Sequence, residues 1–160
     1  MLRLNSKEVI APITRLILVS VFLLPQFSLL AQTKKRVYIE QASYWEANER
    51  IAPNAQRLIG DVRIRHEDIL MWCDSAYTYT GTNRVDAFGN VYINQGDTID
   101  LYANKIIYNG DNNFARASRN VKLINKSTTL YCDTLEYDIE ANIGYYDTGG
   151  KIIDSTNTLT

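Results

Sequence analysis

Apolar and polar side chains alternate over long stretches of this sequence. The pattern is clearest over residues 85–93 and 115–123, where Val91 and Ile93, or Val121 and Leu123, stand two residues apart. A period of two residues is that of a β-strand with one buried face. No stretch of comparable length after residue 31 has a helical period. The pattern therefore predicts an all-β fold.

A second kind of strand changes parity in its middle. In the first example the apolar residue Cys73 is followed by Ala76, and the same odd step occurs in two later stretches. Residues an odd number apart point to opposite faces of a regular strand. We therefore expect a β-bulge or a sharp bend at these points. The predicted positions are Asp74, Asn104 and Asp133, with Gly89-Asn90 as the matching bend in the first kind of strand.

Short polar segments rich in Gly and Asn separate these strands. Those at residues 81–83, 95–97, 109–113 and 125–127 are typical of tight turns. Tight turns join antiparallel neighbours, and a bend in the middle of each strand would divide the stack into two facing sheets. The predicted architecture is a two-sheet β-jelly roll, a V-shaped stack of bent antiparallel strands that is open at both ends.

The bends belong to a sequence repeat of nearly constant length. Its copies are Gly60-Asp61-Val62, Gly89-Asn90-Val91, Arg119-Asn120-Val121 and Gly149-Gly150-Lys151. A fixed period of roughly 30 residues indicates one supersecondary unit stacked on copies of itself. We divide the chain after residue 31 into an N-terminal strand and linker or cap, residues 32–57, and the repeats, residues 58–160. The repeats amount to about three and a half units, the last of them incomplete.

Residues 1–31 have the three-part layout of a secretory signal peptide. Arg3, Lys7 and Arg15 precede an apolar run over residues 16–24, and Pro25 and the small residue Ala31 follow it. The apolar run is too short to span a bilayer comfortably. We predict cleavage after residue 31 and export to the periplasm, with an uncleaved membrane anchor as the alternative.

The two cysteines of this exported chain are not expected to form a disulfide. Cys73 and Cys132 occupy the same position in repeats that are two units apart. If each unit adds two strands, they lie roughly 19 Å apart at about 4.8 Å per strand. A disulfide needs Cα atoms within about 7 Å. We interpret both as small buried residues at the position where the second unit has Ala103.

The repeat resembles a known family. The Gly-Asn-Val phrase and the later Leu-x-(Ala/Cys)-Asp-x-Leu-x-Tyr phrase, best seen over residues 130–137, are similar to the organic-solvent-tolerance-A-like (OstA-like) domain of lipopolysaccharide transport proteins. The resemblance covers residues 37–160. It implies a periplasmic β-jelly roll that binds the acyl chains of lipopolysaccharide between its two sheets. It also implies edge-to-edge assembly into a bridge between the inner and outer membranes.

On this interpretation the inward-facing apolar residues form the lipid-binding interior, and an ordinary closed core is the alternative. The candidates are Val62, Ile64, Met71, Cys73, Val91, Ile93, Leu101, Ala103, Ile106, Val121, Leu123, Leu130, Cys132 and Leu135.

The two ends of the stack are the candidate assembly surfaces. Unpaired strand edges expose N–H and C=O groups that can pair with another strand. The candidates are Val37, Tyr38 and Ile39 at the start and Ile152 and Ile153 at the finish. The expected partners are lipopolysaccharide or another acylated lipid, other lipopolysaccharide transport components and, by strand addition, copies of this chain. The protein is expected in the periplasm, and association with the outer membrane is left open.

The remaining chemistry argues for a non-enzymatic protein without a cofactor or a metal. Without residues 1–31 the formal net charge changes from −1 to −3, so nucleic acid is not an expected partner. His66 is the single histidine, and Asp74 and Asp133 lie too far apart in the repeat to act as an acid–base pair. Basic residues near turns are interpreted as a solvated rim, with contacts to lipid phosphates as the alternative. They are Arg84, Lys105, Arg116, Arg119, Lys122 and Lys126.

Two other functions stay open from the sequence. One is a structural β-solenoid-like envelope or adhesion module that binds protein or glycan on its outer face. The other, a carbohydrate-active enzyme on a β-solenoid, is the weakest, because no two carboxylates are placed to converge.

Overall fold

The computed structural model describes residues 35–47, 54–154 and 158–159 of the chain. The predicted signal peptide, residues 1–31, lies outside the described residues. Regular structure in the described part consists of eleven β-strands. No helix there is long and apolar enough to cross a membrane.

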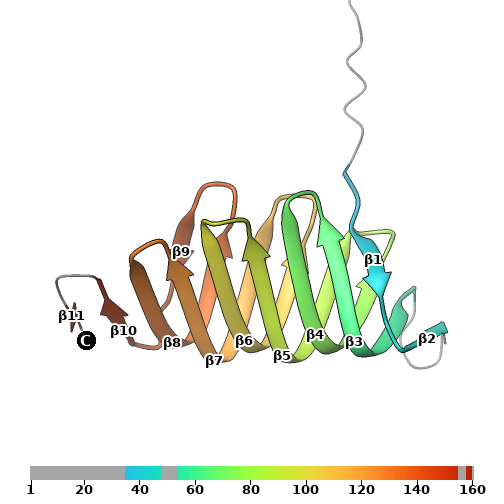
Figure 1. Cartoon of the computed structure of the whole chain (residues 1–160), viewed down its shortest axis with the longest axis horizontal. Coiled ribbons are helices and arrows are strands. Elements are labelled where there is room, and N and C mark those ends of the chain that lie inside the picture. The colour runs from blue at the N-terminus through green and yellow to red at the C-terminus, as the bar shows by residue number, and fades with distance from the viewer. Residues whose placement is uncertain (1–34, 48–53, 155–157, 160) are drawn as a thin grey trace, which may run out of the picture. The chain divides into compact units, whose positions relative to one another are not determined.

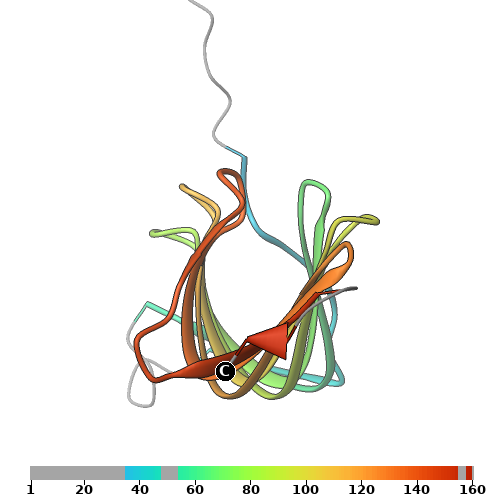
Figure 2. The same cartoon turned by 90° about the vertical axis from the view of Figure 1, so that its left-hand side faces the viewer.

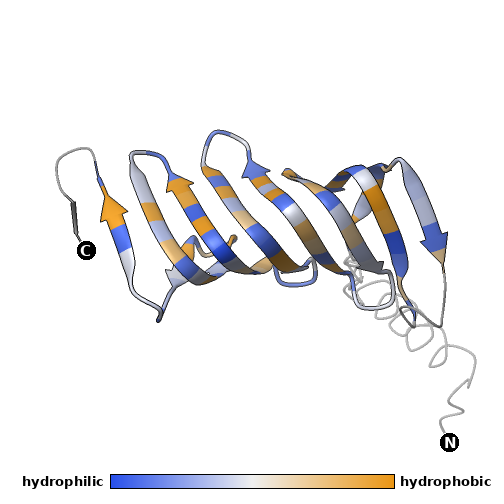
Figure 3. Ribbon diagram, turned by 90° about the horizontal axis from the view of Figure 1, so that it is seen from below, coloured by the Kyte–Doolittle hydropathy of each residue, from blue (hydrophilic) through white to orange (hydrophobic). Residues whose placement is uncertain are grey.

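All eleven strands belong to one antiparallel sheet (Figure 1). Its core is six long strands in chain order: β3 (Gln56–His66), β4 (Ile69–Tyr79), β5 (Arg84–Gln95), β6 (Ile99–Asn109), β7 (Phe114–Asn125) and β8 (Thr128–Asp138). The shorter strands are β1 (Tyr38–Gln41), β2 (Tyr44–Ala47), β9 (Ile143–Tyr145), β10 (Gly150–Ile153) and β11 (Thr158–Leu159). Figure 3 shows hydrophobic and hydrophilic residues alternating along the long strands, as the sequence predicts.

Each long strand bends in its middle, at the positions that the repeat predicts. The pairing register shifts between Ile59 and Val62 in β3, and between Phe88 and Val91 where β5 pairs with β6. Two residues, Gly89 and Asn90, stand opposite the single residue Asn104. The extra residue thus belongs to the Gly-Asn strand, whereas Asp74, Asn104 and Asp133 supply the single opposing residue.

The backbone explains why the bulge falls in the Gly-Asn strands. Gly89 and Asn90 both have positive φ, 75° and 44°, and so do Gly60 and Asp61, 76° and 46°. Gly reaches this left-handed region without strain, and Asn and Asp reach it more readily than other residues. The third copy places Arg119 at φ 67°, where a non-glycine side chain is strained.

The bends divide the sheet into two facing arms (Figure 2). The first arm contains residues 56–59, 75–79, 84–88, 105–109, 114–118 and 134–138. The second arm contains residues 62–66, 69–73, 91–95, 99–103, 121–125 and 128–132. The predicted V-shaped stack of bent antiparallel strands is therefore confirmed. We call the space between the arms the interior, and the opening between their free tips the mouth.

Short strands extend the sheet at each end of the stack. β1 pairs with the second-arm half of β3 and β2 with its first-arm half. At the other end β10 pairs with the second-arm half of β8, and β9 pairs with its first-arm half. Gly150 pairs with Cys132, the partner of Val121, so Gly150 and not Lys151 takes the place of the valine in the fourth copy. The fourth copy is therefore Thr148-Gly149-Gly150, one residue earlier than the predicted Gly149-Gly150-Lys151, because Thr148-Gly149 replaces the Gly-Asn pair.

Candidate functional site

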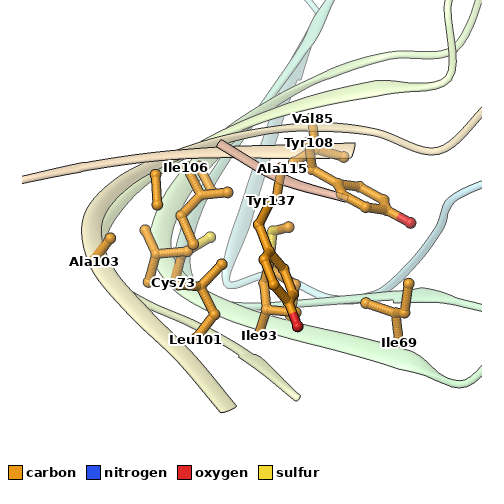
Figure 4. Packing of buried hydrophobic residues seen from close by; sticks show 14 of the residues in the cluster. Ile69, Cys73, Val85, Ile93, Leu101, Ala103, Ile106, Tyr108, Ala115 and Tyr137 are labelled. Atoms are coloured by element: carbon orange, nitrogen blue, oxygen red, sulfur yellow. The ribbon is translucent and has the colours of Figure 1, made fainter. Parts of the chain in front are cut away.

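The interior gathers the residues that the alternation singles out. Thirteen of the fourteen candidates have exposed fractions of 0–7 %, and the fourteenth, Cys132, is partly buried against them. Figure 4 shows Ile93 and Leu101 of the second arm and Ile106 and Tyr137 of the first arm directed into the same space. The side chains of the two arms therefore cover one another in the interior.

The second arm carries a continuous row of large aliphatic side chains. Successive members are directly paired across neighbouring strands, from β1 at one end to β10 at the other. The row is Ile39, Ile64, Met71, Ile93, Leu101, Leu123, Leu130 and Ile152. At about 4.8 Å per strand, its seven steps extend roughly 34 Å. No polar side chain interrupts it.

The first arm carries a line of smaller inward side chains next to the bend. The residues nearest the bend are Leu58, Ala76, Ala87, Ile106, Ala117 and Leu135, again paired in one line across six strands. Three of the six are alanines, so this line carries less side-chain volume than the aliphatic row of the second arm. The arrangement is an apolar interior lined by buried side chains of both arms.

Eleven further residues of the same cluster are not among the fourteen candidates. They are Leu58, Ile69, Ala76, Val85, Ala87, Ile99, Tyr108, Ala115, Ala117, Tyr137 and Ile139. Most of them continue the apolar alternation on the other side of the bend, so the alternation predicts their burial. The alternation does not predict the burial of Tyr108 and Tyr137, because a tyrosine is common on either face of a strand. In the structure both tyrosines are buried in the interior, and this burial raises the pKa of both hydroxyls.

The interior is a poor environment for charge. Burial raises the pKa of the Cys73 thiol to about 12 and also raises the pKa of the Cys132 thiol. Both cysteines are free, and β4 and β8, which carry them, are four strand steps apart. Asp74 is exposed outside the bend, where its carboxylate accepts a hydrogen bond of 2.9 Å from Asn90 Nδ2. Among the described residues no three His, Cys, Asp or Glu side chains converge as metal ligands do.

The basic residues do not converge on the interior. Arg84 donates to Asp86 through two hydrogen bonds of 2.6 and 2.7 Å, and Arg116 pairs with Glu136. Lys105 lies over the Phe88 ring. The ammonium group of Lys122 lies between two outer tyrosine rings, 5.7 Å from the centroid of Tyr102 and 5.8 Å from that of Tyr131. Arg119 stands at a bend and Lys126 in a turn.

The outer face carries an aromatic row. Trp72 and Tyr92 stack with ring centroids 5.1 Å apart, and Tyr92 and Tyr102 stack at 4.6 Å. The Tyr92 hydroxyl also donates to Asp100 Oδ1 at 2.6 Å. Because the rings cover one another's faces, this row stabilises strand pairing and presents mainly ring edges to solvent.

The predicted assembly residues lie near the two ends of the stack. Tyr38 and Ile39 are in β1, the outermost strand of the second arm, whereas Val37 precedes it. Ile152 and Ile153 pair with β8 on one side and with Leu159 and Thr158 of β11 on the other. The outermost described strand at that end is therefore β11. Exposed aromatic side chains also gather at the first end, at Tyr44 and Trp45 of β2.

Comparisons with known proteins agree with this geometry. The sequence model of the family described as OstA-like protein matches residues 34–160. The fold is similar to the crystal structure of LptH, the LptA-homologous periplasmic component of the lipopolysaccharide transport device of Pseudomonas aeruginosa. The TM-score is 0.64 and the identity 15 %, over 74 % of this chain and 94 % of that chain. No curated protein matches the sequence. The structural similarity confirms the predicted β-jelly-roll fold.

Proposed function

Because the chain belongs to the OstA-like protein family, we propose that it is a non-enzymatic lipopolysaccharide transport protein of the periplasm. Its interior would shield acyl chains of lipopolysaccharide, or of another acylated lipid, between the two arms. The similarity to LptH, itself a periplasmic component of such a device, supports this proposal.

The observation that carries the proposal is the aliphatic row from Ile39 to Ile152. Each buried methylene contributes about 0.8 kcal/mol, so a hydrocarbon chain gains most from an uninterrupted apolar path. A sugar would leave its hydroxyl groups without hydrogen-bond partners along the same path, at a cost of about 1–3 kcal/mol per group. The row therefore favours the acyl part of a glycolipid over its oligosaccharide.

The row also supports assembly through the ends. Ile39 and Ile152 extend it to the short strands at the two ends of the sheet, so a module added by strand pairing would continue the apolar path. We propose other lipopolysaccharide transport components, or copies of this chain, as the partners. The exposed aromatic residues of the first end, Tyr44 at 56 % and Trp45 at 53 %, would be buried by such a neighbour.

A binding experiment with matched lipids tests the interior. Affinity for lipopolysaccharide should depend on the acyl chains, so lipopolysaccharide deacylated by chemical hydrolysis should not bind. Ala117→Leu adds bulk to the interior from the first arm, and Ser118→Leu adds the same side chain at the next position, which is not part of the buried cluster. Overpacking costs about 1–3 kcal/mol, so Ala117→Leu should weaken binding about tenfold or more while Ser118→Leu does not. Equal affinity for acylated and deacylated lipid would refute an acyl-chain site.

Sedimentation velocity tests the end surfaces. Tyr44→Lys and Trp45→Lys should reduce concentration-dependent association with copies or partners, because a lysine opposes burial at an edge. Tyr131→Lys is the matched control, since Tyr131 is an exposed aromatic of the outer face of β8 rather than of β1 or β2. Association that is equally sensitive to all three changes would contradict assembly through this end.

A further inference from the structure

A second repeated residue marks the tips of the first arm. Asn54, Asn83, Asn113 and Asn142 recur with the same spacing as Val62, Val91, Val121 and Gly150. All four asparagines have positive φ, between 49° and 60°. Asn is among the residues that adopt this conformation most readily, which accounts for its use in the turn. Backbone bonds join successive tips, from Gly110 N–H to Asn83 O at 2.9 Å and from Ile139 N–H to Asn113 O at 3.0 Å.

The Asn83 side chain holds a segment that crosses the mouth. Its Oδ1 accepts from Val37 N–H at 2.8 Å, and its Nδ2 donates to Lys35 O at 3.0 Å. The same segment leads directly into β1 on the second arm, and Lys35 forms an ion pair with Glu67 at a tip of that arm. In Figure 2 the segment, in blue, descends between the tips of the two arms. Asn83 thus joins the first arm to the segment of residues 35–37 that leads into β1 of the second arm, and we call this segment the strap.

The Asn113 side chain reaches the second arm through Tyr108. The Tyr108 hydroxyl donates to Asn113 Oδ1 at 2.9 Å, so it must accept the hydrogen bond of 2.7 Å from His66 Nδ1. His66 ends β3 at a tip of the second arm, and its ring meets the Tyr108 ring edge-on with centroids 5.8 Å apart. Both side chains are almost fully buried, at 2 % and 1 % exposure. His66 and Tyr108 therefore form a buried contact between the two arms.

The Asn142 side chain makes the third bridge. Its Oδ1 accepts from Asn125 Nδ2 at 2.6 Å and from the Tyr137 hydroxyl. Asn125 ends β7 at a tip of the second arm. It occupies the position of His66 two repeats later, because His66, Gln95 and Asn125 are spaced as the three valines of the repeat are. Each of these three asparagines therefore joins the two arms, directly or through one further group.

The mouth differs from the walls and the bend of the interior. The two walls and the bend are closed by backbone ladders through β3 to β8, and the short strands extend these walls at the two ends. The bridges across the mouth consist of side-chain hydrogen bonds, each contributing about 0.5–1.5 kcal/mol, together with the strap. Separating the tips breaks none of the ladder bonds.

We propose that the mouth is the entrance for acyl chains, and that the bridges centred on Asn83, Asn113 and Asn142 are the latches that close it. The inference rests on the proposed function, since it names the route into the same interior. It explains how an interior filled by its own side chains takes up a hydrocarbon chain: the arms part at their tips and close again over the chain.

A reversible lock tests the route. Both native cysteines are first replaced by alanine, the residue at the equivalent position 103. In this protein Asn125→Cys and Asn142→Cys are introduced, and the two new thiols are joined by a short bis-methanethiosulfonate linker. The control lock joins Asn104→Cys and Asn120→Cys, which lie on adjacent strands at the outer bend, where Asn120 Nδ2 donates a hydrogen bond of 2.9 Å to Asn104 Oδ1. The probe is fluorescently labelled lipopolysaccharide, and its uptake is followed by anisotropy. We expect the mouth lock to slow uptake at least tenfold, reductant to restore it, and the control lock to leave it unchanged.

The opposite change should open the mouth. Tyr108→Phe keeps the buried ring but removes both of its hydroxyl bonds, so uptake should become several-fold faster. Tyr92→Phe is the control, because it removes a hydroxyl bond of the same kind, to Asp100, on the outer face. Unchanged uptake in both the locked protein and Tyr108→Phe would overturn the proposed entrance while leaving the interior site intact. Absence of binding in the unlocked protein would instead refute the proposed function, and the entrance with it.

Discussion

The bulge in the repeat makes a quantitative prediction at Gly89. A Cβ atom added there would lie 2.3 Å from Asp74 Oδ2 and 2.9 Å from Asp74 Cβ and Cγ. The φ of 75° also places any other residue in the left-handed region. The backbone strain costs about 1 kcal/mol. Moving the Asp74 side chain away breaks its bond with Asn90, which costs about 0.5–1.5 kcal/mol more. Gly89→Ala should therefore destabilise the protein by about 1.5–2.5 kcal/mol.

Two other glycines separate the backbone strain from the steric clash in the predicted loss of stability. Gly96 has φ 53° but nothing within 4 Å of an added Cβ, so Gly96→Ala should lose only the strain, about 1 kcal/mol. Gly81 has neither a positive φ nor a neighbour within 4 Å, so Gly81→Ala should change stability by about 0.5 kcal/mol or less.

Urea unfolding measures all three variants. With a slope of about 2 kcal/mol per molar urea, the midpoint of Gly89→Ala should fall by about 0.8–1.3 M. Circular dichroism and tryptophan fluorescence should give coincident transitions if the unfolding is two-state. If Gly89→Ala were as stable as Gly96→Ala, the packing of Asp74 against the bend would not be as we describe it.

Three further predictions concern the bend, the thiols and the outer face. Arg119→Gly should stabilise the protein by up to about 1 kcal/mol in urea, because it relieves a strained left-handed residue; a loss of stability would show that the arginine side chain matters more than its backbone. Cys132 should react with a thiol reagent in the folded protein while Cys73 reacts only on unfolding, and equal native rates would contradict the burial of Cys73. Since the folded pKa of Cys73 is raised to about 12, its contribution to stability should be complete below the ordinary thiol pKa and should be lost as the pH rises toward 12; alanine at this position should reduce that alkaline loss. Tyr92→Ala should cost about 2–3 kcal/mol by removing two ring stacks and a hydroxyl bond, and a cost below about 0.5 kcal/mol would mean that the aromatic row is not structural.

The repeat made much of this fold predictable. Alternation identified the strands, and the odd step after Cys73 placed the bend, because both follow from the geometry of a strand and need no tertiary information. The strand that holds the extra residue was not determined by spacing. It follows from the left-handed backbone at Gly89 and Asn90, a property of conformation rather than of hydrophobicity.

The parts that the sequence did not reveal are those that depend on contacts between the arms. Asn83 and Asn113 read as ordinary turn residues, and His66 as an isolated histidine, because their partners are far away in the chain. The one-residue error in the fourth copy has a similar cause, since Thr148-Gly149 keeps little of the Gly-Asn pattern and only pairing with Cys132 sets its register.

Photocrosslinking tests the central claim, that acyl chains lie between the two arms, most directly. A photoreactive phenylalanine derivative replaces Ile106, which faces the interior, or its neighbour Lys105, whose ammonium group lies over the outer Phe88 ring. After incubation with lipopolysaccharide and irradiation, we predict a lipid adduct at position 106 and none above background at position 105. Equal labelling at the two positions, or labelling at 105 alone, would contradict an interior site.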